Sequence, residues 1–318
     1  MTSLNLSGCM YLAHLPDPLP EGLRNLICGD CTGLTSLPEH LPAGLKYINC
    51  GGCTGLTSLP EHLPAGLKWL DCEGCTSLTR LPEHLPSGLL WLNCKECTGL
   101  THPPERLPEG LKELNCEDCT GLTRLPDSLP DGLERLHCCG CTELTSIPEP
   151  LPVRLEALGV AYCKHITGFQ ESLPEGLAIL SVSNCKGFTR LPSLPERLEH
   201  LDCYGCTGIT RLPSLPEIME YLNCEGCLLL LSEDPRVLEQ IDIDANRGRH
   251  FQLQEMEERL IQREREKWIL MCMGLKDPYS PVKYICTDVL QIMHSHSKEH
   301  LQQEYIQNQT KILGNLYG

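Results

Sequence analysis

The chain has 318 residues, with 42 acidic side chains against 26 basic ones and a formal net charge of −16. This balance argues against a nucleic acid or other polyphosphate as the partner, because binding one requires clustered Lys and Arg. No stretch approaches the roughly 20 apolar residues of a membrane span, and residues 1–20 lack the basic start and apolar core of a secretory signal.

From the N-terminus to residue 246 the chain is expected to form one domain built from a repeating unit. The unit is L-x-x-L-x-C-x-x-C-x-x-L-T-x-L-P-x-x-L-P-x-G, with a period of 22 residues that shortens to 21 near the end. About eleven units run to residue 232, and a partial twelfth is expected at Leu238, Ile241 and Ile243. The first cysteine of a C-x-x-C pair recurs at Cys28, Cys50, Cys72, Cys94, Cys116, Cys138, Cys203 and Cys224.

This unit resembles the leucine-rich repeat, whose length is 20–29 residues and whose core pattern is L-x-x-L-x-L-x-x-N/C-x-L. The resemblance implies an α/β repeat protein, a solenoid with one short parallel strand per repeat on its concave face. No single repeat buries its own apolar face, so the core exists only in the stack. The two prolines of each L-P-x-x-L-P segment predict an extended or polyproline-like convex side.

The proline pattern narrows the resemblance. LPSLPERLEHLDC (191–203) and LPSLPEIMEYLNC (212–224) are similar to the L-P-rich units of secreted leucine-rich-repeat effectors from Yersinia, Shigella and Salmonella. The cysteine-containing unit followed by a helical tail is similar to effectors of intracellular bacteria such as Legionella. The resemblance implies a virulence protein made in the bacterial cytoplasm, secreted, and translocated into the reducing cytosol of a host cell. Its partner would be a host protein or another bacterial effector that it regulates.

The 22 cysteines suggest zinc sites, redox sites or a packed core. The first cysteine of the unit is replaced by Leu6, Val160 or Val182 in other units, and a metal ligand cannot be exchanged for valine. We therefore expect free thiols in a reducing compartment, the first cysteine as a core residue and the second at the N/C position of the turn. Neither a metal nor a cofactor is expected, and the metal and redox interpretations remain the weaker alternatives. Cys139, in the run HCCGC, breaks the pattern and is expected on the concave surface.

The concave face is the candidate binding surface. Side chains alternate along a strand, so the third and fifth positions of L-x-x-L-x-C are expected to face outward, together with the seventh. Tyr47, Trp69 and Trp91 hold the third position in consecutive units and predict an exposed aromatic ladder, a residue type typical of binding hot spots. A bland solvated face is the alternative. The residues predicted to bind the partner are Tyr47, Trp69, Asp71, Glu73, Trp91, Asn93, Lys95, Glu113, Asn115, Glu117, Arg135, His137, Tyr204 and Tyr221.

Residues 247–318 are expected to form a helical C-terminal domain that caps the open end of the solenoid. Residues 250–273 carry apolar side chains at helical spacing, and the pair Ser280–Pro281 is typical of a helix start. Cys286-Thr287-Asp288 is similar to the nucleophile motif of the ubiquitin ligases that share the L-P-rich repeats, although that ligase domain is far larger than this tail. Residues 296–300 read H-x-x-E-H, a zinc-binding spacing whose third ligand is expected further downstream than the chain extends.

The sequence therefore predicts a non-catalytic, monomeric leucine-rich-repeat effector without a cofactor or a membrane span. It would dock a host protein or another bacterial effector through its concave face and inhibit or recruit it. The alternative is a leucine-rich-repeat ubiquitin ligase, or a ligase adaptor, that acts through the C-terminal helical region with Cys286 as nucleophile.

Overall fold

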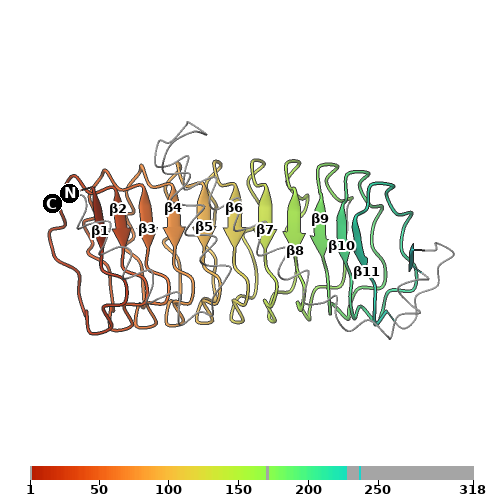
Figure 1. The fold of residues 1–318 in the computed structure, drawn as a ribbon, viewed down its shortest axis with the longest axis horizontal. Coiled ribbons are helices and arrows are strands. Elements are labelled where there is room, and N and C mark those ends of the chain that lie inside the picture. The colour runs from red at the N-terminus through yellow and green to blue at the C-terminus, as the bar shows by residue number, and fades with distance from the viewer. Residues whose placement is uncertain (1, 170–171, 228–235, 238–318) are drawn as a thin grey trace, which may run out of the picture. The chain divides into compact units, whose positions relative to one another are not determined.

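The computed structural model describes residues 2–169, 172–227 and 236–237. Eleven strands form one sheet in which each strand pairs in parallel with its neighbours in chain order (Figure 1). Equivalent residues of successive repeats pair with each other, so that Tyr47 lies opposite Trp69 and Trp69 opposite Trp91. The strands are β1 (Ser3–Asn5), β2 (Asn25–Ile27), β3 (Tyr47–Asn49), β4 (Trp69–Asp71), β5 (Trp91–Asn93), β6 (Glu113–Asn115), β7 (Arg135–His137), β8 (Ala157–Gly159), β9 (Ile179–Ser181), β10 (His200–Asp202) and β11 (Tyr221–Asn223).

The core runs through the middle of this stack. In the fourth repeat, Leu67, Leu70, Cys72, Cys75 and Leu78 are all 0% exposed. These are the apolar positions of the repeating unit, and the same positions are buried in the repeats on either side. Each repeat therefore completes the core of its neighbours, as expected of a leucine-rich-repeat solenoid.

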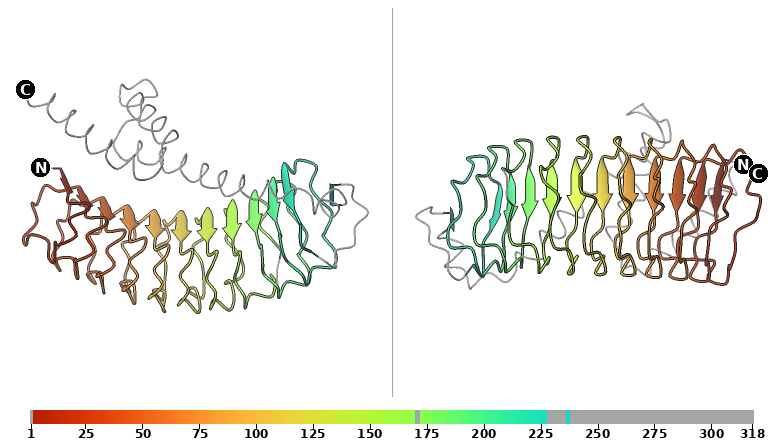
Figure 2. Two further views of the ribbon diagram at one scale, coloured as in Figure 1. Left: turned by 60° about the horizontal axis from the view of Figure 1, so that its bottom comes forward. Right: turned by 180° about the vertical axis from the view of Figure 1, so that it is seen from behind.

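The convex half of each described repeat consists of turns, bends and isolated β-bridges and contains no helix. In the L-P-x-G-L segments the leucine N–H donates to the proline carbonyl three residues earlier, as from Leu67 to Pro64 at 2.9 Å. Gly55 lies so close to the preceding repeat that a Cβ would lie 2.7 Å from the Thr32 carbonyl oxygen. Figure 2 shows the strands on the inner side of the curved repeat array and these segments on its outer side.

Several sequence predictions fall outside the described residues. They are the partial twelfth repeat, the domain boundary at 246/247, the helical cap, Cys286 and the H-x-x-E-H motif. Within the part of the chain that the structure describes, no helix has the length and apolar character needed to cross a bilayer.

Candidate functional site

The first cysteine of each pair is a core residue, as predicted. Cys28, Cys50, Cys72, Cys94, Cys116, Cys138, Cys203 and Cys224 are each at most 2% exposed. Val160 and Val182, which replace it in two repeats, are both 0% exposed. The position therefore accepts a small apolar side chain, and a free cysteine behaves as one. The Cys94 thiol also contacts the Asn115 carbonyl oxygen at 3.3 Å, a contact that the valines lack.

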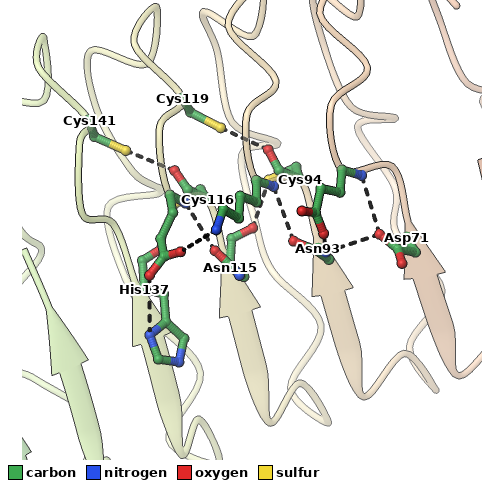
Figure 3. A network of polar contacts seen from close by, with 11 residues as sticks. Asp71, Asn93, Cys94, Asn115, Cys116, Cys119, His137 and Cys141 are labelled. Carbon is green, nitrogen blue, oxygen red and sulfur yellow. Dashed lines mark hydrogen bonds and ion pairs between the residues drawn. The ribbon is translucent and has the colours of Figure 1, made fainter. Parts of the chain in front are cut away.

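The second cysteine links adjacent repeats by a hydrogen bond. Its thiol donates to the carbonyl oxygen of the first-cysteine position one repeat earlier, as from Cys119 to Cys94 at 2.9 Å (Figure 3). Ten such bonds run from Cys31 to Cys227, with distances between 2.9 and 3.1 Å. The acceptor is a backbone carbonyl, so the bond persists where the residue is Val160. The first cysteine of a pair therefore packs in the core and the second bonds to the preceding repeat, and neither role requires a shared metal.

The buried thiols predict that the protein loses stability in alkali. Burial raises the pKa of Cys185 from its ordinary 9.0 to about 11 and that of Cys206 to about 12. Between pH 9 and pH 11 the unfolded chain therefore binds fewer protons than the folded chain, and the free energy of unfolding falls as pH rises. We expect the urea midpoint, measured with a phosphine reductant, to decrease steadily above pH 9. A urea midpoint that stays constant between pH 8 and pH 11 would contradict this prediction.

The last residues of β3 to β7 form a polar network at one edge of the concave face. We call Asn49, Asp71, Asn93, Asn115 and His137 the strand-end row. The Asp71 carboxylate accepts the Nδ2–H of Asn49 at 3.1 Å. The Nδ2–H of Asn93 donates to the same carboxylate at 3.0 Å (Figure 3). It also accepts the backbone N–H of Glu73 at 3.2 Å, an Asx turn that ends the strand.

This network changes the interpretation of the residues that we predicted to bind a partner. Asn93 and Asn115 are 0% and 3% exposed, and each accepts the backbone N–H two residues later. His137 is 6% exposed. The expectation of a solvent-facing row is therefore wrong for these three residues, because neighbouring repeats cover them. The structure gives the amides of Asn93 and Asn115 a task in ending their strands.

The charged side chains beside the strand-end row pair with one another across repeats. The Lys95 Nζ lies 3.3 Å from the Glu117 carboxylate. Burial lowers the pKa of Lys95, but the carboxylates of Glu117, Glu73 and Glu96 together outweigh burial and the net pKa is raised, so Lys95 stays protonated. Arg135 lies 3.8 Å from Glu113 and 3.9 Å from Glu156.

The first residues of the strands, the strand-start row, carry the aromatic side chains. Tyr47 and Trp91 are partly exposed, so the prediction of an exposed ladder agrees with these two residues. Trp69 and Glu113 are each only 7% exposed, so the expectation that they face solvent is wrong. The Tyr47 hydroxyl accepts the Nδ2–H of Asn49 at 3.2 Å, which ties this row to the strand-end row. At the other end of the sheet the rings of His200 and Tyr221 are 6.2 Å apart.

Strand β8, which follows β7 in the sheet, begins and ends with small residues. Ala157 and Gly159 stand where the neighbouring strands carry Arg135 and His137. A Cβ on Gly159 would lie 2.9 Å from the Cys139 sulfur, so the glycine provides the space that this thiol occupies. Cys139 is partly exposed, in line with its predicted place on the surface. Gly159 is the one glycine among the last residues of the eleven strands. This exception in the repeat could have indicated the place of Cys139 from the sequence alone.

The five aromatic residues among the predicted partner-binding residues divide into two groups along the sheet. Tyr47, Trp69 and Trp91 are adjacent in register, whereas Tyr204 and Tyr221 lie at the C-terminal end of the array. Within residues 2–169, 172–227 and 236–237, no cluster of three or more His, Cys, Asp or Glu side chains is placed to hold a metal ion.

Three solved structures with a similar fold are distant from this chain in sequence. YopM from Yersinia enterocolitica is 20% identical over 70% of this chain and 73% of its own, with a TM-score of 0.39. YopM from Yersinia pestis is 23% identical over 70% of this chain and 83% of its own, with a TM-score of 0.33. A leucine-rich-repeat protein from Bacteroides ovatus is 18% identical over 72% of this chain and 69% of its own, with a TM-score of 0.46. No protein-family model and no curated protein matches the chain, and similarity at this level extends no further than the fold.

Proposed function

We propose that this protein is a non-catalytic binding module that docks a partner protein on its concave face. One observation carries the proposal: three consecutive strands, β3, β4 and β5, begin with aromatic residues in direct register. Large rigid aromatic side chains dominate the energetics of protein interfaces. Tyr47 and Trp91 are partly exposed, and Trp69 lies between them in the register.

The acidic charges on the strand-end side of this aromatic group favour a basic partner surface at that edge. Asp71 and Glu73 follow Trp69 directly along the chain, and both carboxylates are partly exposed. With a net charge of −16, the protein attracts positively charged surfaces and repels other copies of itself, which favours a monomer.

The biological setting that we propose rests on the resemblance of the L-P-rich units to bacterial effectors. In that setting the protein acts in the host cytosol and inhibits or recruits a host protein or another bacterial effector. A reducing cytosol also suits the buried free thiols on which the repeat stack depends.

The aromatic anchors are tested by the double variant Trp69→Ala/Trp91→Ala. Hot-spot truncations cost at least about 2 kcal/mol each, so partner affinity is expected to fall by about a hundredfold or more. The assay is capture of partners from host-cell lysate and from the secreted proteins of the bacterium, quantified by mass spectrometry. Tyr11→Ala is the matched control, because Tyr11 is 96% exposed and lies outside the strands. If the folded double variant captures the same proteins as the wild type, the proposal is wrong.

The ligase alternative assigns the activity to Cys286. It predicts that Cys286→Ala abolishes ubiquitin transfer in vitro and leaves partner capture unchanged. That outcome, together with unimpaired capture by the Trp69→Ala/Trp91→Ala variant, would replace the binding-module proposal.

A further inference from the structure

A second continuous row runs beside the aromatic one, formed by the residue directly before each strand. Each member donates its backbone N–H to the carbonyl of its counterpart one repeat earlier, from Arg24 to Glu220, with N···O distances of 2.7–2.9 Å. These bonds hold the members in one line along the sheet. We call them the pre-strand row: Arg24, Lys46, Lys68, Leu90, Lys112, Glu134, Glu156, Ala178, Glu199 and Glu220.

The charges of the pre-strand row are segregated by sign. The first half holds four basic residues and no acidic one, and the second half holds four acidic residues and no basic one. The two halves meet where the Lys112 Nζ lies 2.8 Å from the Glu134 carboxylate. All ten members are exposed or partly exposed, so these charges are available to a partner.

The fold does not require this order. Leu90 and Ala178 occupy the same position, so the stack accepts a neutral side chain there. The lysines do have local contacts, since the Nζ of Lys68 donates to the Gly88 carbonyl at 2.9 Å and that of Lys112 to the Gly132 carbonyl at 3.2 Å. Those contacts explain single lysines but not the separation of the two signs.

The separation of basic from acidic residues along the row also lowers the stability of the protein when no partner is bound. Adjacent strands lie about 4.8 Å apart, and like charges directly opposite each other on neighbouring strands are destabilising. Alternating signs would instead give attractive pairs between repeats, as Lys95 and Glu117 do on the same face. A partner with the opposite charge order would neutralise both halves of the row, and this is the arrangement under which segregation is favourable.

We propose that the pre-strand row is a docking edge for a protein segment of opposite charge order. The acidic part of the segment faces residues 24–112 and its basic part faces residues 134–220. This inference rests on the proposed binding function and adds the direction in which the partner lies along the repeats. Nine strand steps of about 4.8 Å give a row of about 43 Å, the length of about 13 extended residues. A second copy is disfavoured as the occupant because each chain carries a net charge of −16.

The test compares two synthetic peptides of about 14 residues, a length set by the row. The segregated peptide has a block of Glu followed by a block of Lys, and the control peptide alternates Glu and Lys at the same composition. Each exposed ion pair changes an equilibrium constant by about twofold, so six matched charges favour the segregated peptide by about fiftyfold at low ionic strength. Fluorescence anisotropy with the full chain measures both affinities. Equal binding of the two peptides would overturn the inference.

Two charge-reversal variants sharpen the test. Lys46→Glu/Lys68→Glu leaves the first half of the row with two basic and two acidic residues, and Glu199→Lys/Glu220→Lys does the same to the second half. Each alone is expected to remove most of the preference for the segregated peptide. Combining them leaves both halves of the row without net charge, so the combined variant is expected to bind the segregated and the alternating peptide equally. A combined variant that keeps the full preference for the segregated peptide would also overturn the inference.

The closing controls separate this inference from the proposed function. The Trp69→Ala/Trp91→Ala variant is expected to keep its preference for the segregated peptide, since neither tryptophan belongs to the pre-strand row. If the peptides bind equally while that variant loses its natural partners, only the docking edge is wrong. Sedimentation at increasing concentration tests the choice of occupant: a dimer that dissociates in the reversal variants would show that the row pairs with a second copy and overturn the assignment to another protein.

Discussion

Replacing Asp71 with Ala is expected to lower the free energy of unfolding by about 2–4 kcal/mol, a large loss for a side chain on the open face. The carboxylate accepts hydrogen bonds from Asn49, from Asn93 and from the backbone N–H of Glu73. Bonds to a charged acceptor contribute about 1.5–3 kcal/mol each. Because Asp71 is only partly buried, solvent screening is expected to reduce the loss below the sum of the three bonds. Asn93, which is 0% exposed, would lose one of its amide contacts.

Chemical unfolding followed by circular dichroism measures this effect, with Asn5→Ala as the matched control. Asn5 holds the same place in the first repeat, where it is exposed and its side-chain oxygen accepts the backbone N–H of Ser7 at 3.0 Å. Its removal is expected to cost about 0.5–1 kcal/mol. Asp71→Asn keeps an acceptor for the Glu73 N–H and should recover part of the loss. Equal effects at residues 5 and 71 would mean that the strand-end network adds nothing beyond a local turn.

Much of the fold follows from the period of the sequence. A constant spacing of 22 or 21 residues places equivalent residues one strand apart, so the register of the sheet and the burial of positions such as Leu70 are determined once the repeat is found. The exchange of the first cysteine for Val160 and Val182 identified it as a core position without any coordinates. These inferences succeed because each depends on the chemistry of a single position in the unit.

The candidate site was harder to predict because it depends on what stands in the neighbouring repeats. Period-2 alternation places Trp69 and Asn93 on the concave face, but their burial depends on the size of the side chains one strand away. The hydrogen bonds of Asp71 likewise require an amide in each adjacent repeat, at Asn49 and Asn93. The thiol donor of the second cysteine was also not visible in the sequence, since its acceptor is a backbone carbonyl about one repeat earlier.

The two cysteines of the unit are expected to respond oppositely to the same substitutions. At the first position, Cys94→Val should change the free energy of unfolding by less than about 1.5 kcal/mol, because the side chain is 2% exposed and the position accepts valine in other repeats. At the second position, Cys119→Val should cost about 1–3 kcal/mol. It removes the donor to the Cys94 carbonyl, 2.9 Å away, and introduces a branched side chain into a turn.

Serine distinguishes hydrogen bonding from packing at the same two sites. Cys119→Ser retains a donor in the turn and should be less destabilising than Cys119→Val, whereas Cys94→Ser places a hydroxyl in the apolar core and should be more destabilising than Cys94→Val. The four unfolding midpoints, measured in reductant, therefore form a crossed pattern. A metal or redox pair predicts instead that valine and serine are equally damaging at both sites, because either one removes the thiolate ligand. The crossed pattern would assign the C-x-x-C spacing to two hydrogen-bonding and packing roles that happen to lie three residues apart in the repeat.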